Sequence, residues 1–153
     1  MEAVILVGIQ ASGKSTFYQQ RFFDTHVRIS RDLLRTRSRE GLLLQACLEG
    51  RQPFVVDNTN VRAEERARYV AAAKAVGYRV VGYFFRTDTR AAIARNKQRT
   101  GKAVVPIPGI LGTYKKLEEP RMEEGFDALF TVTLTPANEF VVEPFTAAGP
   151  AGE

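Results

Sequence analysis

The chain has 153 residues, about the length of one domain, and hydrophobic residues make up 44% of it, which excludes a disordered protein. One cysteine, Cys47, and one histidine, His26, exclude an internal disulfide and any metal site that needs two imidazoles or several thiolates. The net charge of +5 favours a negatively charged partner, and the absence of a signal peptide or a long apolar run predicts a cytoplasmic protein without membrane contact.

Strand-like and helix-like segments alternate along the chain. The sequence predicts four strands, at 3–9, 26–30, 53–57 and 79–85. Each strand is followed by a predicted helix, at 15–23, 31–49, 62–77 and 89–99 respectively. Gly41 is a candidate break within 31–49, and two prolines exclude a regular helix over 102–108. A helix over 110–119 and strands over 126–134 and 139–144 follow, with the last strand antiparallel at an edge.

This alternation predicts an α/β fold in which helices cover both faces of an open, mostly parallel sheet. Ligands of such sheets bind beyond the carboxyl ends of the strands. We therefore expect one crevice to be shared by the loops at 8–15, 30–35, 57–61 and 86–90. We also expect residues 1–145 to form a single domain and residues 146–153 to be a frayed tail.

Residues 8–15 read GIQASGKS and match the phosphate-loop pattern G-x-x-x-x-G-K-[ST], between a predicted strand and a predicted helix. In this motif, backbone amides wrap a phosphate, Lys14 reaches the β- and γ-phosphates, and Ser15 can ligate Mg²⁺. The alternative is a Gly/Ser turn before a helix. The motif predicts ATP or another NTP and Mg²⁺ as cofactors. Its nucleotide cradle consists of Gln10, Ala11, Ser12, Gly13, Lys14, Ser15 and Thr16.

Two aspartates follow predicted strands and therefore face the same crevice. Asp32, in ISRDLLR, is placed to take a proton from an attacking hydroxyl, or else it caps the helix that starts beside it. Asp57 ends the strand PFVVD and fits a magnesium site, an acceptor site or a structural ion pair equally well. Asn60 is equally well explained as the N-cap of the next helix.

Residues 86–102 carry six Arg and Lys against one acid, Asp88. Arg95 and Arg99 lie four apart on one helical face, where a phosphate chain would neutralise both, although a solvated basic face is the plain alternative. The stiff, proline-containing loop that follows suits a lid, at about 95–108, closing over the nucleotide.

Together, GIQASGKST, ISRDLLR, VVDNTN, RNKQRTGKAVVPI and YKKLEEP resemble the kinase module of the polynucleotide 5′-hydroxyl kinase family, from about residue 3 to 143. The resemblance implies a P-loop NTPase fold of the nucleoside-monophosphate-kinase-like type. It also implies roles for individual residues. Lys14 and Ser15 would hold the phosphates and magnesium, and Asp32 would be the general base that activates the 5′-hydroxyl.

The resemblance extends to the acceptor and the lid. Arg35 would contact a phosphate of the acceptor strand, Asp57 would orient Arg35, and Thr59 and Asn60 would shape the same pocket. Arg95 and Arg99 would bind the donor phosphates, with Arg99 nearest the γ-phosphoryl group. The family is usually fused to a phosphatase or ligase domain, so we expect any such activity to come from separate end-processing enzymes.

Three functions remain open at this point. The first is ATP-dependent phosphorylation of the 5′-hydroxyl of a DNA or RNA end, with either a short single-stranded end or a mononucleotide as the acceptor. The second is a small-metabolite kinase of the same fold, for a sugar, nucleoside or antibiotic. The third is a nucleotide-gated ATPase or binding module without an acceptor.

The charge is unevenly distributed along the chain. Residues 1–116 hold 21 of the 22 Lys and Arg, whereas residues 117–153 hold one arginine and eight acids. We therefore expect the arginines to be focused on phosphates and the acidic C-terminal segment to pack away from the site.

Overall fold

The computed structural model describes residues 1–101 and 104–147. Two stretches with earlier predictions lie outside the described residues: 102–103, within the expected lid, and 148–153, within the expected frayed tail. The strands are β1 (Glu2–Val7), β2 (Val27–Ile29), β3 (Phe54–Val56), β4 (Arg79–Phe85), β5 (Ala128–Leu134) and β6 (Phe140–Pro144). The helices are α1 (Lys14–Arg21), α2 (Arg31–Leu34), α3 (Arg37–Glu49), α4 (Ala63–Ala75), α5 (Thr89–Asn96), α6 (Ile107–Lys116) and the 3₁₀ turn η2 (Met122–Glu124).

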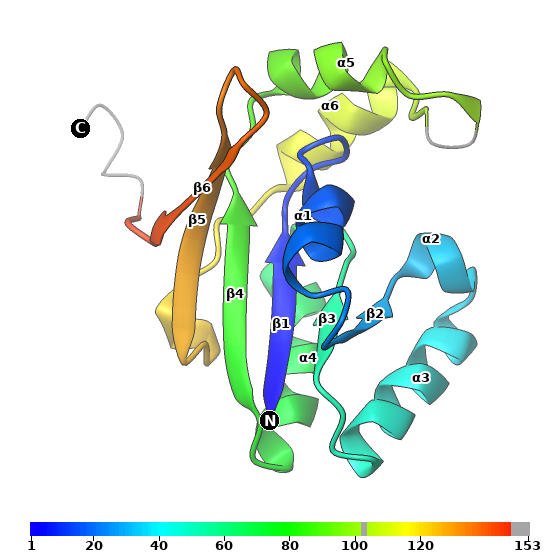
Figure 1. The fold of residues 1–153 in the computed structure, drawn as a ribbon, viewed down its shortest axis with the longest axis vertical. Helices are drawn as coiled ribbons and strands as arrows, with labels where there is room; N and C mark the ends of the chain where they lie inside the picture. Colours follow the sequence, from blue (N-terminus) through cyan, green and yellow to red (C-terminus); the bar gives the residue numbers. More distant parts are fainter. Residues whose placement is uncertain (102–103, 148–153) are drawn as a thin grey trace.

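The strands form one six-stranded sheet in the order β2-β3-β1-β4-β5-β6 (Figure 1). β1 is central and runs parallel to β3 on one side and β4 on the other. β2 and β5 also pair in parallel with their neighbours. β6 alone is antiparallel and lies at the edge. The predicted open, mostly parallel sheet with an antiparallel last strand is confirmed.

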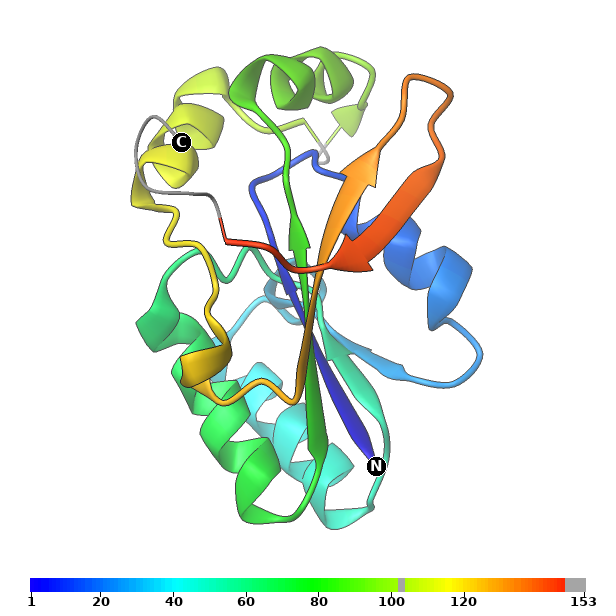
Figure 2. The same cartoon turned by 90° about the vertical axis from the view of Figure 1, so that its left-hand side faces the viewer.

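Helices cover both faces of the sheet, with α1 on one side and α3 and α4 on the other (Figure 2). This explains why β1 is apolar at every position from Ala3 to Val7. Val4 and Leu6 point toward the α1 layer, while Ile5 and Val7 point toward the α3–α4 layer. All four side chains are fully buried, and each contributes roughly 1.5–3 kcal/mol to the free energy of folding.

The segment predicted as one helix or two over 31–49 breaks at Arg35 and not at Gly41, which lies inside α3. Arg35 adopts a positive φ of 76°, and Thr36 then caps α3 by accepting a hydrogen bond from the Arg39 amide. The helix continues through Gly41, where an added Cβ would meet no other atom within 4 Å. Cys47 is buried on α3, and burial raises the pKa of its thiol, as expected for an unreactive cysteine.

The proline-containing stretch 102–108 was predicted to lack a regular helix, and this is wrong at its end. α6 begins at Ile107, with Pro106 as its N-cap and Pro108 in the first turn. A proline is tolerated there because the amides of the first turn have no partner within the helix. α5 and α6 lie beyond the carboxyl ends of the strands (Figure 1).

The acidic C-terminal segment neutralises cations away from the phosphate loop. Its ion pairs are Glu119 with Arg86, Glu124 with Arg66, and Asp127 with Lys74. The pair with Arg66 is buried: Arg66 is fully inaccessible and donates two hydrogen bonds to Glu124. Within residues 1–101 and 104–147, no helix has the length and apolar character needed to cross a membrane.

Candidate functional site

The phosphate loop leaves β1, reverses, and enters α1 at Lys14. Ala11 and Gly13 both have positive φ, of 60° and 98°, and Gly13 is the N-cap of α1. A Cβ on Gly13 would lie 3.0 Å from the Phe140 ring, and one on Gly8 would lie 2.9 Å from Phe85 Cβ. Side chains are therefore excluded at both glycines, and the backbone is left free to approach a phosphate.

The Lys14 side chain folds over this loop. Its Nζ donates hydrogen bonds to the carbonyl oxygens of Gly8, at 2.9 Å, and Ile9, at 2.8 Å. Burial lowers the pKa of Lys14 to about 8; the carboxylate of Asp57 opposes this effect and the charge of Arg99 adds to it. The ammonium thus lies in a partly dehydrated position where an added anion would be strongly attracted.

Ser15, at the start of α1, meets the end of β3. Its hydroxyl donates a 2.9 Å hydrogen bond to Asp57 Oδ2. Arg28, from β2, donates to the same Asp57 oxygen at 2.8 Å and also to Ser15 Oγ at 3.1 Å. The sequence suggested that Asp57 would orient Arg35; in the described part of the chain, the arginine bound to Asp57 is Arg28 and not Arg35.

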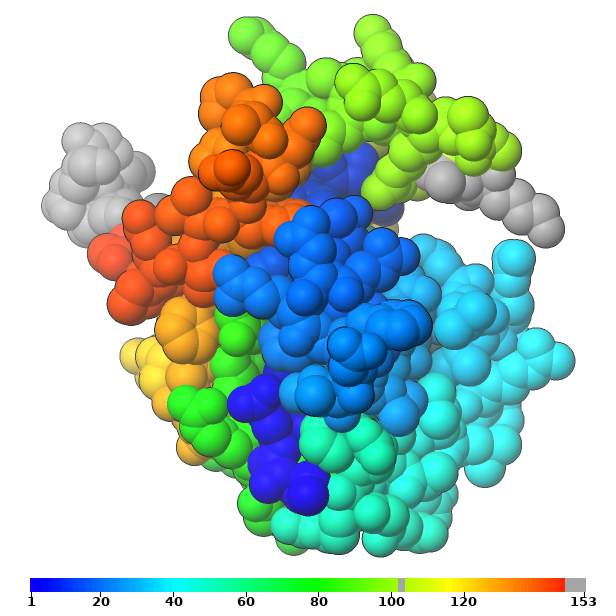
Figure 3. All heavy atoms as spheres, in the orientation of Figure 1, coloured from blue at the N-terminus to red at the C-terminus, as the bar shows by residue number. Residues whose placement is uncertain are grey.

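Three adjoining cavities surround the loop, and Figure 3 shows the surface hollowed between the segments near residues 31–40 and 90–101. We name them by position. The central cavity, of about 500 Å³, contains Lys14, Ser15, Arg28, Asp32, Arg35, Asp57 and Arg99. The side cavity, of about 730 Å³, shares Gln10, Asp32, Asn58, Thr59 and Val105 with it. The hairpin cavity, of about 260 Å³, lies on the other side of the loop.

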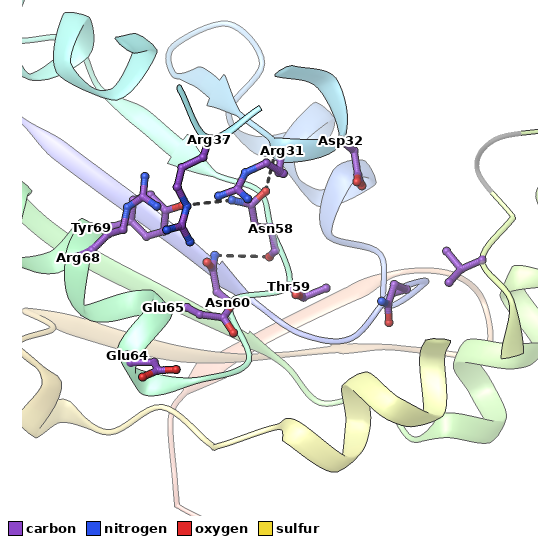
Figure 4. A pocket seen from close by; sticks show the side chains of 12 residues that line it. Arg31, Asp32, Arg37, Asn58, Thr59, Asn60, Glu64, Glu65, Arg68 and Tyr69 are labelled. Atoms are coloured by element: carbon purple, nitrogen blue, oxygen red, sulfur yellow. Dashed lines mark hydrogen bonds between the residues drawn. The ribbon is translucent and has the colours of Figure 1, made fainter. Parts of the chain in front are cut away.

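Asp32 borders both the central and the side cavity (Figure 4). The interpretation that it caps a helix is wrong, because Ser30 is the N-cap of α2 and accepts the Leu33 amide. Asp32 is exposed, and among the described residues its carboxylate takes part in no hydrogen bond or ion pair. It is thus open to a hydroxyl that enters either cavity.

Thr59 and Asn60 hold the loop after β3 against β1. The Thr59 carbonyl accepts the Gly8 amide at 2.9 Å, and the Asn60 side chain donates to the Leu6 carbonyl at 2.8 Å. Asn60 is not a helix cap, since Arg62 has that position before α4. Asn60 has a positive φ of 48°, and its carbonyl accepts a hydrogen bond from buried Arg66. Both residues line the side cavity.

Arg95 and Arg99 reach the phosphate loop from α5 and the residues after it. Arg95 Nη1 donates to the Ala11 carbonyl at 3.2 Å, and burial lowers the pKa of this guanidinium. Arg99 lines both the central and the hairpin cavity. Asn96, which is buried, pairs with both backbone groups of Val105, at 2.6 and 2.8 Å, and so fixes the segment after 103 to α5.

The hairpin cavity contains residues that the sequence did not assign to the site. Three of them come from the β5–β6 hairpin: Leu134, Asn138 and Phe140. The other residues that line this cavity come from the phosphate loop, α1, α5 and the segment after α5: Ala11, Gly13, Thr16, Arg95, Gln98 and Arg99. The hairpin of the acidic segment therefore reaches the loop, although its acids do not line this cavity. By contrast, residues 86–90, expected to share the crevice, line none of the three cavities among the residues that the structure describes.

A buried acid that sequence reasoning missed, Glu40, binds four of the residues that line the side cavity. Glu40 lies on α3, is fully inaccessible, and accepts hydrogen bonds from Arg31, Arg68, Tyr69 and Asn58. Burial by itself raises the pKa of this carboxyl, but the hydrogen bonds outweigh it and hold the pKa below its ordinary value. Glu40 thus fixes the arginines of this wall as an ionised group.

Comparison with known proteins gives partial matches. A family model described as an AAA domain matches residues 39–109, slightly less than half of the chain. A bifunctional polynucleotide phosphatase/kinase of Schizosaccharomyces pombe is 32% identical over 74 residues, which are 48% of this chain. The same stretch is 18% of that relative, so this chain matches only a small part of its length.

Solved structures show the fold. A gluconokinase from Sinorhizobium meliloti superposes with a TM-score of 0.61 at 21% identity, covering 86% of this chain and 82% of its own. Chaetomium thermophilum Kti12, solved with ADP-AlF3, superposes with a TM-score of 0.65 at 15% identity, and the match covers 86% of this chain and 88% of Kti12. The chain has a kinase-like α/β P-loop NTPase fold. This confirms the predicted fold class, and the fold by itself does not identify the substrate.

Proposed function

We propose that the protein is a phosphotransferase that moves the γ-phosphoryl group of ATP to the 5′-hydroxyl of a DNA or RNA end. One observation carries this proposal: an exposed carboxylate without a partner in the described chain, Asp32, borders the same cavity as Lys14, Ser15 and Arg99. Residues 1–145 would act as one domain, with residues 95–108 as its lid. The partial match to a polynucleotide phosphatase/kinase supports the choice of acceptor.

The donor would lie along the phosphate loop. The amides from Gln10 to Thr16 and the ammonium of Lys14 would bind its β- and γ-phosphates. Arg95 and Arg99 approach the loop from above and would neutralise charge on the transferred group. The hairpin cavity is the remaining space beside the loop for the base and sugar of the nucleotide.

The pairing of Ser15 Oγ with Asp57 Oδ2 supplies the oxygen ligands that Mg²⁺ prefers. No group of three His, Cys, Asp or Glu side chains that could hold a metal is found within the described residues. Ser15 and Asp57 would hold a magnesium ion that accompanies the nucleotide. When bound, the ion supplies charge neutralisation during phosphoryl transfer.

Asp32 would accept the proton of the attacking hydroxyl, while the acceptor is held beside it. Arg35 lines the central cavity next to Asp32 and would bind the phosphate on the 3′ side of the reacting sugar. Thr59 and Asn60 would border the acceptor. An acceptor that carries a phosphate makes use of Arg35, whereas a neutral sugar or nucleoside does not.

An acceptor screen tests this function. The protein is incubated with γ-labelled ATP, Mg²⁺ and, separately, 5′-hydroxyl DNA, 5′-hydroxyl RNA, nucleoside 3′-monophosphates, nucleosides and neutral sugars. Label on the 5′-hydroxyl oligonucleotides is expected, with Lys14→Ala as the inactive control. Label on a nucleoside or sugar alone would indicate a small-metabolite kinase. Release of inorganic phosphate without any labelled acceptor would indicate an ATPase.

A further inference from the structure

The side cavity has a wall of arginines that the reaction described above does not use. Arg31, Arg37 and Arg68 come from three helices, α2, α3 and α4, and line the same cavity (Figure 4). Arg35, by contrast, lines the central cavity. Positive charge is thus gathered at two places, one beside Asp32 and Lys14 and one farther along the side cavity.

Glu40 holds two of these arginines in place from below. Arg31 donates to its two carboxylate oxygens at 3.1 and 3.2 Å, and Arg68 donates to Oε1 at 3.0 Å. Arg68 also stacks over the Tyr69 ring, 4.9 Å from its centroid. Because a guanidinium has five N–H donors, Arg31 and Arg68 keep most of theirs for a ligand.

The charges on this wall do not cancel. Glu40 supplies one negative charge against Arg31 and Arg68, and Arg37 has no acidic partner in the described part of the chain. Three acids line the cavity: Asp32, where it adjoins the central cavity, and Glu64 and Glu65, at the exposed first turn of α4. The cavity therefore has a wall of arginines, with these acids along the rest of its lining.

We propose that Arg37 and Arg68 form a second phosphate subsite, for the internucleotide or terminal phosphate one nucleotide beyond the phosphate at Arg35. Glu40 is its positioning residue. This inference rests on the proposed function, because the reacting hydroxyl at Asp32 determines where the acceptor begins. A volume of about 730 Å³ lies within the usual range of small-molecule sites, roughly 300–1,000 Å³, and so can take more than a hydroxyl group.

With this subsite, a short acceptor that carries two phosphates should be phosphorylated with a higher kcat/KM than an acceptor that carries one. We compare a nucleoside 3′-monophosphate with a 5′-hydroxyl dinucleotide that ends in a 3′-phosphate. For the wild-type chain, kcat/KM is expected to be about tenfold or more higher for the dinucleotide, as one charge-assisted phosphate contact predicts. Arg68→Gln should remove this preference by raising KM for the dinucleotide alone, with KM for ATP unchanged.

Glu40→Gln tests the positioning role. It should raise KM for the dinucleotide about tenfold, while kcat and KM measured with the monophosphate stay near their wild-type values. A general loss of folding would instead lower activity with both acceptors. For Arg68→Gln, the matched control is Arg79→Gln, which also removes one arginine but at the opposite ends of the strands. If Glu40→Gln does not fold, Arg68→Gln still decides the question, since Arg68 is partly exposed.

A binding measurement distinguishes a failure of the subsite from a failure of the proposed function. Calorimetric titration with each acceptor in the presence of ADP does not require catalysis. Dinucleotide binding that depends on Arg68, without transfer to any 5′-hydroxyl, would overturn the proposed function and keep the subsite. Equal affinity for the two acceptors, or an equal loss for both in Arg68→Gln, would overturn the subsite whether or not transfer occurs.

Discussion

Arg28 donates a 2.8 Å hydrogen bond to Asp57 Oδ2, the same oxygen that accepts the Ser15 hydroxyl. Its Nη2 also lies 3.1 Å from Ser15 Oγ. A guanidinium therefore occupies the two oxygens that best fit a magnesium ion. Two cations that share these ligands repel each other, so we expect Arg28 to move aside, or its hydrogen bonds to weaken, if a magnesium ion binds here as proposed.

Replacing Arg28 should therefore make the metal bind more easily. In Arg28→Gln, we expect the Mg²⁺ concentration that gives half-maximal binding of a fluorescent ADP to fall about three- to tenfold, because a nearby positive charge is removed. The measurement is a magnesium titration at fixed nucleotide. Arg79→Gln is the control for net charge. An unchanged midpoint would show that Arg28 does not compete with the metal.

Asp32 is predicted to act on the acceptor and not on the donor. Asp32→Asn should lower kcat for a 5′-hydroxyl oligonucleotide about 10²- to 10⁴-fold, as expected for loss of a general base. The dissociation constant of ATP should stay within about twofold, because Asp32 contacts none of the loop amides in the described structure. Equal loss of activity and of ATP binding would contradict this assignment.

The lowered pKa of Lys14 predicts a pH dependence for nucleotide binding. Phosphate binding should need the ammonium form, which predominates about one pH unit or more below 8 and is lost as the pH rises through about 8. ATP affinity measured by fluorescence between pH 6.5 and 9.5 should be flat at low pH and then fall by up to about tenfold per pH unit. Lys14→Arg, which stays charged, should give a flat profile; a flat wild-type profile would be contrary to the prediction.

The same group has the opposite effect on folding. The pKa of Lys14 in the folded chain, about 8, lies below its ordinary value of 10.5, so the unfolded chain binds more protons between these two pH values. The contribution of Lys14 to stability therefore rises from pH 8 to 10.5, while nucleotide affinity falls. Urea unfolding and ATP titrations across this range should change in opposite directions.

The buried pair of Arg66 and Glu124 should matter far more to stability than an exposed pair of the same kind. Glu124→Gln leaves the inaccessible Arg66 without its counter-charge, at a cost of about 3 kcal/mol in the free energy of unfolding. Lys74→Gln breaks the half-exposed pair with Asp127 and should cost less than about 1 kcal/mol. Urea unfolding of both variants gives the comparison; equal losses would contradict it.

Local sequence patterns predicted the elements that depend on local rules. The strand before GIQASGKS, the helix after it and the mostly parallel arrangement of the sheet follow from apolar runs, glycine positions and strand–helix alternation. The placement of Asp32 and Asp57 near the loop follows in the same way, since both lie shortly after the carboxyl ends of parallel strands.

Contacts between distant segments could not be predicted. Glu40 is one charge among several near the start of a helix, where acids usually face solvent, and only its four partners from other elements make it part of the core. Arg28 replaced Arg35 as the partner of Asp57 because β2 lies next to β3, a pairing that no local pattern encodes. The break at Arg35 likewise depends on a positive φ without a glycine to signal it.

The Phe140 ring, on the last strand, touches the glycine that opens α1. The two residues are 127 positions apart in the sequence, yet both border the hairpin cavity. If the nucleotide occupies this cavity, as proposed, its affinity depends on β6 staying docked in the sheet. A bound nucleotide is then expected to favour that docking over fraying of the edge strand.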